Sequence, residues 1–374
     1  MYQYSEFQRS NTLIQKIKNL DYPLIIMVLL LGVISFFIMY SVDEGKILHH
    51  TKTHFTKFVI FFPLMIFLSM FDIKLWHRVA YLSYLTVLVL LVWVEFFGFE
   101  AGGSQRWIDL KFINFQPSEL MKICLILCLA KYYHKIQIND VNKFFPVLNS
   151  MIIIFLPMVL VINQPDIGTS ILLGTSGIIV LWLSGLKIKY FFYSFLGLLI
   201  SLPFIFSYLK EYQKLRILTF FNPNRDPLGS GYHIIQSKIA VGSGGFYGKG
   251  FLKGTQSYLE FLPEKETDFI FTLFAEQFGF IGSVILLLIY GGIIYRIIKI
   301  GLISRNHFSK LFCYGFSFTI FLNITVNMLM VLGLLPVVGS PLPILSYGGS
   351  SMLTMIIGFS IVLSAKINSK ISLS

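Results

Sequence analysis

Residues 23–41 decide the fold class, and they read PLIIMVLLLGVISFFIMYS. No charged residue occurs between Asp21 and Asp43. A helix of about 20 predominantly apolar residues is long enough to cross the hydrocarbon core of a bilayer. The stretch therefore predicts a membrane-spanning helix. We expect no cleavable signal peptide, because the chain is polar up to Asp21 and this first apolar run is long enough to span.

Comparable apolar stretches recur along the whole chain. Of its 374 residues, 55% are hydrophobic and 13% are charged, whereas a soluble domain is typically about 25% charged. We predict an all-α polytopic membrane protein with about ten transmembrane helices, forming a single domain over residues 1–374. The predicted spans are residues 23–41, 56–71, 79–97, 118–133, 146–163, 168–184, 189–208, 269–297, 312–334 and 348–366.

Lysine and arginine predict the orientation of these spans, because short cytoplasmic loops carry an excess of both. With the N-terminus in the cytoplasm, the inner segments hold sixteen such residues and the short outer loops hold five. We therefore expect both termini in the cytoplasm and one large extracytoplasmic loop, residues 209–268, between spans seven and eight. The net charge of +12 lies mainly beside the spans, so we expect no nucleic-acid partner.

The first polar motif precedes and enters the fourth span. Arg106 and Trp107 place a cation beside a flat apolar face, which suits contact with a sugar or a phosphate. Glu119 and Lys122 are spaced i, i+3 and share one helix face. Ionisable groups inside a span are costly and face a partner or a wet cavity. A structural ion pair and a cavity for a charged head group are both consistent with this pattern.

Asp166 follows a Gln164-Pro165 turn between the fifth and sixth spans. An aspartate at this position is a favoured helix N-cap. Its side of the membrane is that of the other acidic groups, so a role in a site stays open as well.

The long loop is rich in glycine and lysine but fits no nucleotide motif. A phosphate-binding loop ending at Lys249 would need serine or threonine at Gly250. Successive N–H groups with Lys238, Lys249 and Lys253 predict instead a cradle for a diphosphate. The alternative is a flexible solvated loop.

Asp268 ends the long loop, shortly after Glu264. It occupies a suitable position for the N-cap of the eighth span. Asp268, Thr272 and Glu276 also recur every four residues, which predicts a polar stripe entering the membrane on one face. A carboxylate at the hydrocarbon boundary is partly desolvated and suits general-base work.

An uncharged segment of small residues leads into the tenth span. Close helix packing explains it most simply. The hydroxyls of Ser346 and Ser351, beside free N–H groups at a helix start, predict a mild anion site as well.

In this order, the motifs resemble those of the SEDS family of bacterial cell-wall polymerases (shape, elongation, division and sporulation proteins). The similarity covers about residues 20–366, and within the family the chain resembles the elongation member. The motifs are Arg106-Trp107-Ile108 with Gln116-Pro117-Ser118-Glu119, Gln164-Pro165-Asp166-Ile167-Gly168-Thr169, the loop from Gly231 to Asp268, Gly333-Leu334-Leu335-Pro336 and Ser346-Tyr347-Gly348-Gly349-Ser350.

The resemblance implies a peptidoglycan glycosyltransferase that polymerises lipid II into glycan strands during elongation and maintenance of rod shape. It implies a multi-pass protein of the bacterial cytoplasmic (inner) membrane with its active site on the outer face. A class B penicillin-binding protein, which is a transpeptidase, and other membrane proteins of the elongation complex are the implied partners. The implied ligands are lipid II and undecaprenyl diphosphate.

The resemblance also implies roles for individual residues. Asp268 matches the proposed catalytic aspartate, and we expect it to act as the general base. Trp107, Glu119, Lys122 and Asp166 match positions important for activity. The other residues predicted to bind substrate are Arg106, Arg216, Lys238, Lys249, Gln256, Glu264, Ser346 and Ser351.

A divalent cation is a further candidate for offsetting the negative charge of the diphosphate. Mg²⁺ or Mn²⁺ would act there together with Arg216, Lys238 and Lys249. No other cofactor is expected.

Two other function classes stay open from the residues alone. A lipid II flippase would use polar groups near the midplane, such as Glu119, Lys122 and Glu276. A non-catalytic scaffold of a cell-wall complex would not need carboxylates, lysines and glycines gathered in one outer loop. Because the polar residues lie mainly on the predicted outer side of the membrane, the sequence favours an enzyme over a flippase or a scaffold.

Overall fold

The computed structural model describes residues 12–101, 104–109, 114–208, 211–222, 230–254 and 265–371. Within these ranges the chain is mostly helical, and each predicted span corresponds to one helix. These helices are α2 (Tyr22–Val42), α3 (His49–Ser69), α4 (Ile73–Phe97), α5 (Pro117–His134), α6 (Phe144–Asn163), α7 (Ile167–Leu183), α8 (Ile188–Tyr208), α12 (Ile270–Ile303), α13 (His307–Val331) and α14 (Gly349–Ile367).

Among the described residues, 7 helices are long and apolar enough to cross a membrane, namely α2, α3, α4, α6, α12, α13 and α14. Helices α7 and α8 contribute shorter apolar stretches. Helix α5 is less apolar because it carries Glu119, Lys122 and Lys131, all of which are buried. The predicted class, a helical multi-pass membrane protein, is confirmed.

Three helices begin five or more residues earlier than predicted. Helix α3 begins at His49 rather than residue 56, α4 at Ile73 rather than 79, and α13 at His307 rather than 312. The prediction followed the apolar segment alone. Backbone hydrogen bonds within a helix do not depend on side-chain polarity, so each helix continues past the apolar segment into polar residues.

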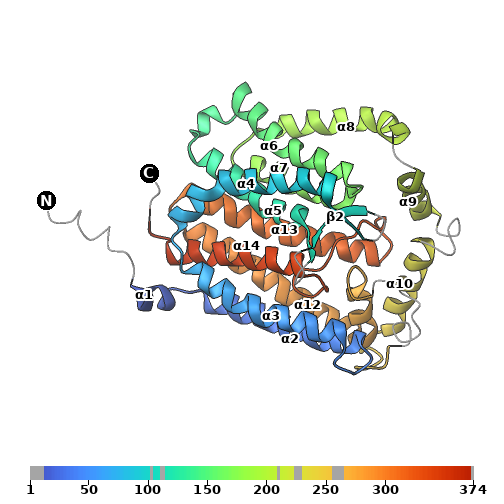
Figure 1. The fold of residues 1–374 in the computed structure, drawn as a ribbon. Coiled ribbons are helices and arrows are strands. Elements are labelled where there is room, and N and C mark those ends of the chain that lie inside the picture. Colours follow the sequence, from blue (N-terminus) through green and yellow to red (C-terminus); the bar gives the residue numbers. More distant parts are fainter. Residues whose placement is uncertain are drawn as a thin grey trace.

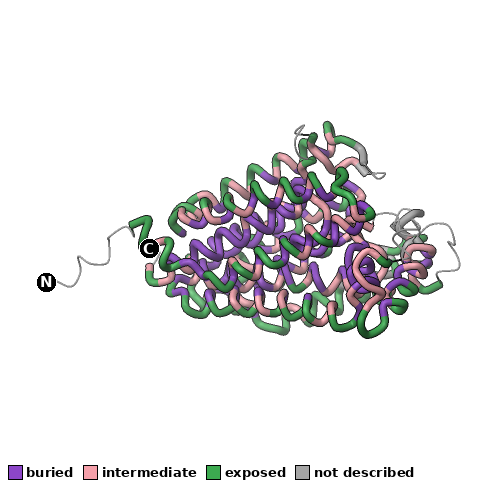
Figure 2. The backbone as a smooth tube through the Cα atoms, turned by 90° about the horizontal axis from the view of Figure 1, so that it is seen from below, coloured by how far each residue is buried: buried purple, intermediate pink, exposed green. Residues whose placement is uncertain are grey.

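The interior of the bundle is formed by α5 and α14. Helix α5 is buried along nearly its whole length and packs against α4, α7, α13 and α14. Helix α14 packs against α3, α5 and α12. Figure 2 shows the buried residues gathered along the middle of the bundle and the exposed ones on its rim. Polar residues on α5 therefore face protein rather than lipid.

Most of the non-spanning elements lie at one end of the bundle (Figure 1). A three-stranded antiparallel sheet lies there, in the order β1-β2-β3, with helices α9 and α10. The short helix α1 and the end of α14 lie at the opposite end (Figure 1). The bounds of these elements are α1 (Leu13–Lys18), β1 (Phe99–Ala101), β2 (Ser104–Asp109), β3 (Asn114–Phe115), α9 (Glu211–Phe221) and α10 (Ser230–Gly244), and a 3₁₀ turn covers Ile138–Asp140.

Helix α12 is broken at Gly279, whose φ of 65° is not helical. The break frees main-chain groups that the segment following α10 then binds. Lys249 N donates to Glu276 O at 3.0 Å, and Gly250 N donates to Gln277 O at 3.0 Å. The glycine-rich segment therefore completes the hydrogen bonding of a broken helix inside the bundle.

Two glycines, one at the end of α10 and one just after it, are required by close packing. A Cβ at Gly248, where φ is +80°, would overlap the carbonyl oxygen of Gln277. A Cβ at Gly244 would overlap the carbonyl oxygen of Ala275. The predicted backbone cradle for a diphosphate is thus wrong at Lys249 and Gly250, because their N–H groups bind α12. The expectation of a flexible loop is wrong for residues 230–244, which form α10 and pack against α12 and α13.

Candidate functional site

The segment between α13 and α14, residues 332–348, lies at the centre of the candidate site; we call it the α13–α14 segment. A Cβ at Gly168, in the first turn of α7, would overlap the carbonyl oxygen of Val338. A Cβ at Gly339 would lie 3.5 Å from Asp268 Oδ2. The start of α7 and the turn before α12 therefore meet the same few residues of this segment.

Asp166 is the N-cap of α7 and is also an ion-pair partner. Its Oδ1 accepts from Thr169 N at 3.0 Å, and its Oδ2 accepts from Thr169 Oγ1 at 2.8 Å. Arg106 Nη1 lies 3.1 Å from Asp166 Oδ2. The N-cap interpretation of Asp166 is confirmed, and the carboxylate also holds a cation, whereas its role in a site stays a prediction. At 5% exposure it is largely withdrawn from solvent.

Strand β2 carries Arg106 and Trp107 to this cap. The guanidinium carbon of Arg106 lies 6.0 Å from the Trp107 ring centroid, close enough for a cation–π contact. Gln116 was not in the predicted site, but its Nε2 donates to Asp166 Oδ2 at 3.3 Å. Its position just before Pro117, at the start of α5, was the signal in the sequence that could have indicated a role in the site.

Glu119 and Lys122 form the predicted ion pair on α5. Lys122 Nζ lies 2.8 Å from Glu119 Oε1, and the two side chains are 1% and 5% exposed, lysine first. Glu119 Oε2 is buried and has no hydrogen-bond partner among the described residues. The pair lies one to two turns below Gln116, so it belongs to the inner wall of the same region.

Ser350, rather than Ser351, connects the sheet to α14. Its Oγ accepts from Gln116 N at 2.9 Å and donates to Asn114 O at 2.7 Å. Ser351 Oγ instead donates to Gly348 O at 3.2 Å within its own turn. The two serines are neighbours in sequence but point to different sides of α14, so only the Ser350 hydroxyl reaches the sheet.

Asp268 does not cap α12, contrary to one of its two interpretations. The helix begins at Ile270, and its N-cap residue is Phe269 rather than Asp268. Asp268 lies in the preceding turn and is partly exposed. Asn327 Nδ2 donates to its main-chain oxygen at 2.9 Å and to Ser340 O. The main chain at Asp268 is thereby fixed against the α13–α14 segment.

Two further hydrogen bonds hold this turn. Ser346 Oγ donates to Thr267 O at 2.7 Å, and Tyr347 N donates to Glu266 O at 2.8 Å. Ser346 is 1% exposed, and its hydroxyl binds main chain. Its role in substrate binding stays a prediction.

The polar stripe below Asp268 is buried. Thr272 Oγ1 lies 2.9 Å from Ser237 Oγ of α10. Glu276 is 0% exposed on its side chain and pairs with Lys249 Nζ at 2.8 Å. Lys249 was predicted to bind substrate; the structure places its charge against a carboxylate.

Among the other predicted cations, Lys238 is exposed on α10 beside Gly333 of the α13–α14 segment. Arg216 lies in α9, but its side chain is outside the described part of the structure. Gln256 and Glu264 lie outside the described residues altogether.

Tyr347 links the candidate site to α3. Lys57 Nζ lies 5.1 Å from its ring centroid, and the His50 ring lies 5.1 Å away. Burial raises the pKa of Tyr347 above its ordinary value. The negative charges of Glu266 and Asp43 add to the rise, and a hydrogen bond with Thr53 opposes it. The phenol is therefore neutral at physiological pH.

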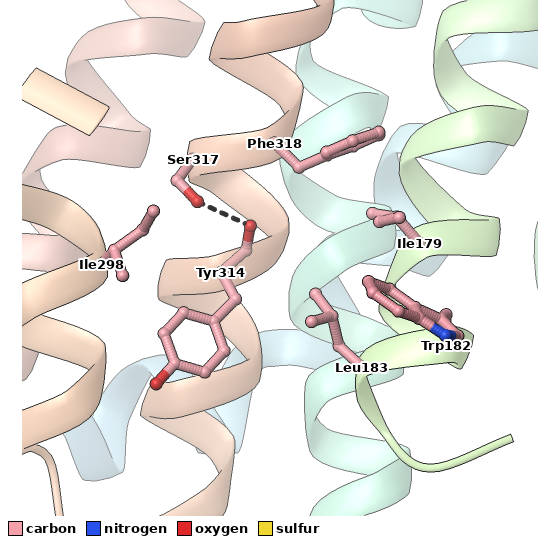
Figure 3. Close-up of a pocket in the computed structure, with 7 residues that line it drawn as sticks. All are labelled: Ile179, Trp182, Leu183, Ile298, Tyr314, Ser317 and Phe318. Atoms are coloured by element: carbon pink, nitrogen blue, oxygen red, sulfur yellow. Dashed lines mark hydrogen bonds between the residues drawn. The ribbon is translucent and has the colours of Figure 1, made fainter. Parts of the chain in front are cut away.

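The described residues hold no group of three or more histidine, cysteine or carboxylate side chains placed to bind a metal. A divalent cation at the diphosphate stays a prediction. An apolar groove of about 330 Å³ lies between α7, α12 and α13, with Trp182, Ile298 and Phe318 among its lining residues (Figure 3). None of the predicted site residues lines it, and along α7 it lies about 20 Å from Asp166.

The arrangement is a polar, carboxylate-rich site at one end of a helical membrane bundle. One carboxylate, Asp166, is withdrawn into a cap, whereas Asp268 is partly exposed on a turn whose main chain is held. Such a group can accept a proton from a hydroxyl brought to the turn. The class is therefore a multi-pass membrane protein with a polar candidate site that carries carboxylates at the end of the bundle.

A family model described as "Cell cycle protein", for FtsW, RodA and SpoVE, matches residues 21–371. The chain belongs to this family, and the resemblance to the SEDS proteins is confirmed.

Relatives and solved structures agree with that assignment. The chain is 39% identical over 347 residues to the peptidoglycan glycosyltransferase MrdB of Escherichia coli K12, covering 92% of this chain and 93% of MrdB. It is 36% identical over 340 residues to MrdB of Helicobacter pylori, covering 88% and 85%.

Two solved structures share the fold. A chain from a study titled "Structural coordination of polymerization and crosslinking by a peptidoglycan synthase complex" matches with a TM-score of 0.81 at 28% identity, covering 94% of this chain and 98% of that one. The Thermus thermophilus rod shape determining protein RodA matches with a TM-score of 0.70 at 23% identity, covering 94% and 97%.

Proposed function

We propose that Asp268 is the general base of a glycan-strand polymerase that uses lipid II during cell elongation. The chain is a peptidoglycan glycosyltransferase by its relation to the MrdB enzymes. One observation carries the assignment of the base. Asp268 is partly exposed in a turn, and Ser346 and Tyr347 hold this turn through hydrogen bonds to the main chain just before Asp268. Asp268 is not the N-cap residue of α12.

The reaction needs a base, an acceptor hydroxyl and a leaving group. Asp268 takes the proton of the sugar 4-hydroxyl in lipid II as that oxygen attacks the anomeric carbon of the growing strand. The bond to undecaprenyl diphosphate breaks, and its electron pair leaves with the diphosphate. A single displacement converts the α-linked donor into a β-linked product.

Cations near the turn offset the charge that develops on the diphosphate. Lys238 is exposed on α10, next to the α13–α14 segment, and is suited to this role. Lys249 shares its charge with Glu276. Arg106, paired with Asp166 and 30% exposed, is placed to bind a sugar or phosphate group together with Trp107.

The membrane topology follows from the same proposal. Ten helices, α2 to α8 and α12 to α14, cross the cytoplasmic membrane as one domain with both termini inside. Residues 209–268 and the candidate site then face outward, where lipid II is presented. The sheet and α10 lie at the end of the bundle opposite α1 and the end of α14, which supports this orientation (Figure 1).

The partner is a protein that cross-links the strands. One structural neighbour comes from a peptidoglycan synthase complex that coordinates polymerization and crosslinking. We propose that this chain binds a class B penicillin-binding protein and works among the membrane proteins of the elongation complex.

Polymerisation from labelled lipid II tests the assignment. The full chain, purified with its transpeptidase partner, is compared with Asp268→Asn and with the control Asp72→Asn. Asp72 pairs with Lys16 of α1, away from the site, and its side chain is 50% exposed. We expect polymer from the wild type and the control only. Normal turnover by Asp268→Asn would exclude this base. Lipid II crossing vesicles without polymer would favour the flippase, and neither activity would favour the scaffold.

A further inference from the structure

A buried histidine on α3 contacts the site without belonging to any predicted motif. His54 is 1% exposed, and its Nε2 forms a short hydrogen bond with Ser35 Oγ of α2, which is fully buried. Polar groups buried between apolar helices are costly unless they are hydrogen-bonded.

The pair touches the main chain of the α13–α14 segment. Ser35 Oγ lies 3.2 Å from Ile344 O and 3.2 Å from Leu345 O. The serine hydroxyl has one hydrogen, and these carbonyl oxygens can only accept it. If the hydroxyl donates to either carbonyl oxygen, His54 donates from Nε2. Its Nδ1 is then the bare nitrogen, and it has no hydrogen-bond partner among the described residues.

The carbonyl groups that Ser35 binds belong to a strained turn. Ile344 has φ of 67°, a conformation that a β-branched residue adopts rarely. Such a conformation persists only where the surroundings impose it. The bonds from Ser35 and the bond from Tyr290 Oη to Pro343 O, at 2.8 Å, lie on either side of Ile344 and supply that constraint.

Residues next to the strained turn hold the main chain just before Asp268. Ser346 Oγ accepts from Leu342 N at 2.8 Å across the turn and donates to Thr267 O at 2.7 Å. The next residue, Tyr347, donates its N–H to Glu266 O. A continuous path of hydrogen bonds and main chain thus joins His54 to the turn that carries Asp268.

We propose that His54, acting through Ser35 and the strained turn at Ile344, is a positioning residue for Asp268. It does not touch the reacting atoms. It holds the conformation from which Ser346 and Tyr347 fix residues 266 and 267. This inference rests on the proposed role of Asp268, because positioning matters only if the carboxylate reacts.

The test measures turnover and local structure in the full chain with its transpeptidase partner. His54→Leu removes the donor, and Ser35→Ala removes the link to the carbonyl groups. His54→Gln restores an N–H donor at a similar reach. Ser364→Ala is the matched control, because Ser364 Oγ makes a comparable bond to Phe71 O, at 2.6 Å, outside this path.

We expect His54→Leu and Ser35→Ala to lower kcat by about 10–100-fold with KM nearly unchanged, since a misplacement of about 1 Å can cost 10²-fold. The double variant is no slower than the worse single variant, because both changes cut one path. His54→Gln recovers most of the rate. Ser364→Ala lowers thermal stability to a similar degree and leaves kcat unchanged.

Hydrogen–deuterium exchange supplies a readout that does not depend on activity. Peptides covering residues 265–269 and 342–348 exchange faster in His54→Leu than in the wild type or in Ser364→Ala. Unchanged exchange there, or a kcat within twofold of the wild type, would overturn the proposal. Normal turnover by Asp268→Asn would instead reject the base assignment, and exchange would still report whether His54 holds the turn.

Discussion

Asp166 and Asp268 occupy similar places in the sequence and different places in the molecule. Each precedes an apolar helix and suits an N-cap. Asp166 is the cap of α7, accepting from Thr169, and is 5% exposed. Asp268 lies one residue before the cap of α12, which is Phe269, and is partly exposed. The same pattern thus yields one carboxylate that caps a helix and another that lies partly exposed in a turn, where we propose that it acts as the base.

The largest effect expected from this difference is on turnover. Asp268→Asn should lower the polymerisation rate by about 10²–10⁴-fold, the range that general-base catalysis contributes. Asp268→Glu keeps a base but displaces it by one methylene, so it should retain part of the rate. Polymerisation from labelled lipid II, with unfolding temperature recorded in parallel, checks both variants. Equal rates for the two variants would show that proton transfer at Asp268 is unimportant.

Lys122→Met should have the largest effect on stability. It leaves Glu119 buried without its cation, which typically costs about 3–5 kcal/mol. Adding Glu119→Gln removes that charge and should recover most of the loss. Thermal unfolding of the single and double variants measures the difference.

Activity of the double variant then separates the two interpretations of this pair. Recovered stability with no polymer indicates a site role, whereas recovery of both indicates a structural ion pair. A double variant as unstable as Lys122→Met would contradict the ion-pair argument.

Asp166 offers a smaller and graded effect. Asp166→Ala loses the cap and leaves Arg106 and Gln116 without their acceptor, at a cost of roughly 2–3 kcal/mol. Asp166→Asn keeps a capping oxygen and should cost about 1 kcal/mol less. Unfolding temperatures rank the variants. If the two were equally unstable, the cap would not be the main contribution of Asp166.

The smallest effect concerns Tyr347, beside the turn that carries Asp268, and the pH dependence of the protein's stability. Because the pKa of Tyr347 is raised by burial, the folded protein keeps the proton that the unfolded chain releases near pH 10. The stability contributed by the neutral phenol is complete below about pH 10 and is lost as the pH rises through the folded pKa. Tyr347→Phe should therefore lose less stability between about pH 9 and 11. Parallel unfolding curves for wild type and variant over that range would contradict the buried position of this ring.

Several features of the site were predictable because they depend on short-range spacing. The Glu119–Lys122 pair follows from an i, i+3 separation on one helix. The cap at Asp166 follows from its place before an apolar run. Gln116 was missed because its bond to Asp166 crosses from one helix start to another.

The glycine-rich stretch after α10 was misinterpreted for a related reason. Its composition is consistent with anion binding, but its N–H groups bind the carbonyl groups that the break at Gly279 frees in α12. A break in a helix is visible only in three dimensions, and so is the segment that completes it. The hydrogen bonds of Ser350, which link the sheet to α14, were not predicted for the same reason.

The sequence by itself determined the class of this protein and the approximate position of its helices. Inside a bilayer every backbone polar group must be satisfied within the protein, so long apolar runs leave little choice but helices. The tertiary structure alone decided which carboxylate is consumed by a cap, which glycines meet α12, and how His54 reaches the turn before Asp268. These outcomes depend on hydrogen bonds between residues far apart in the chain, whose geometry is set by how the helices pack.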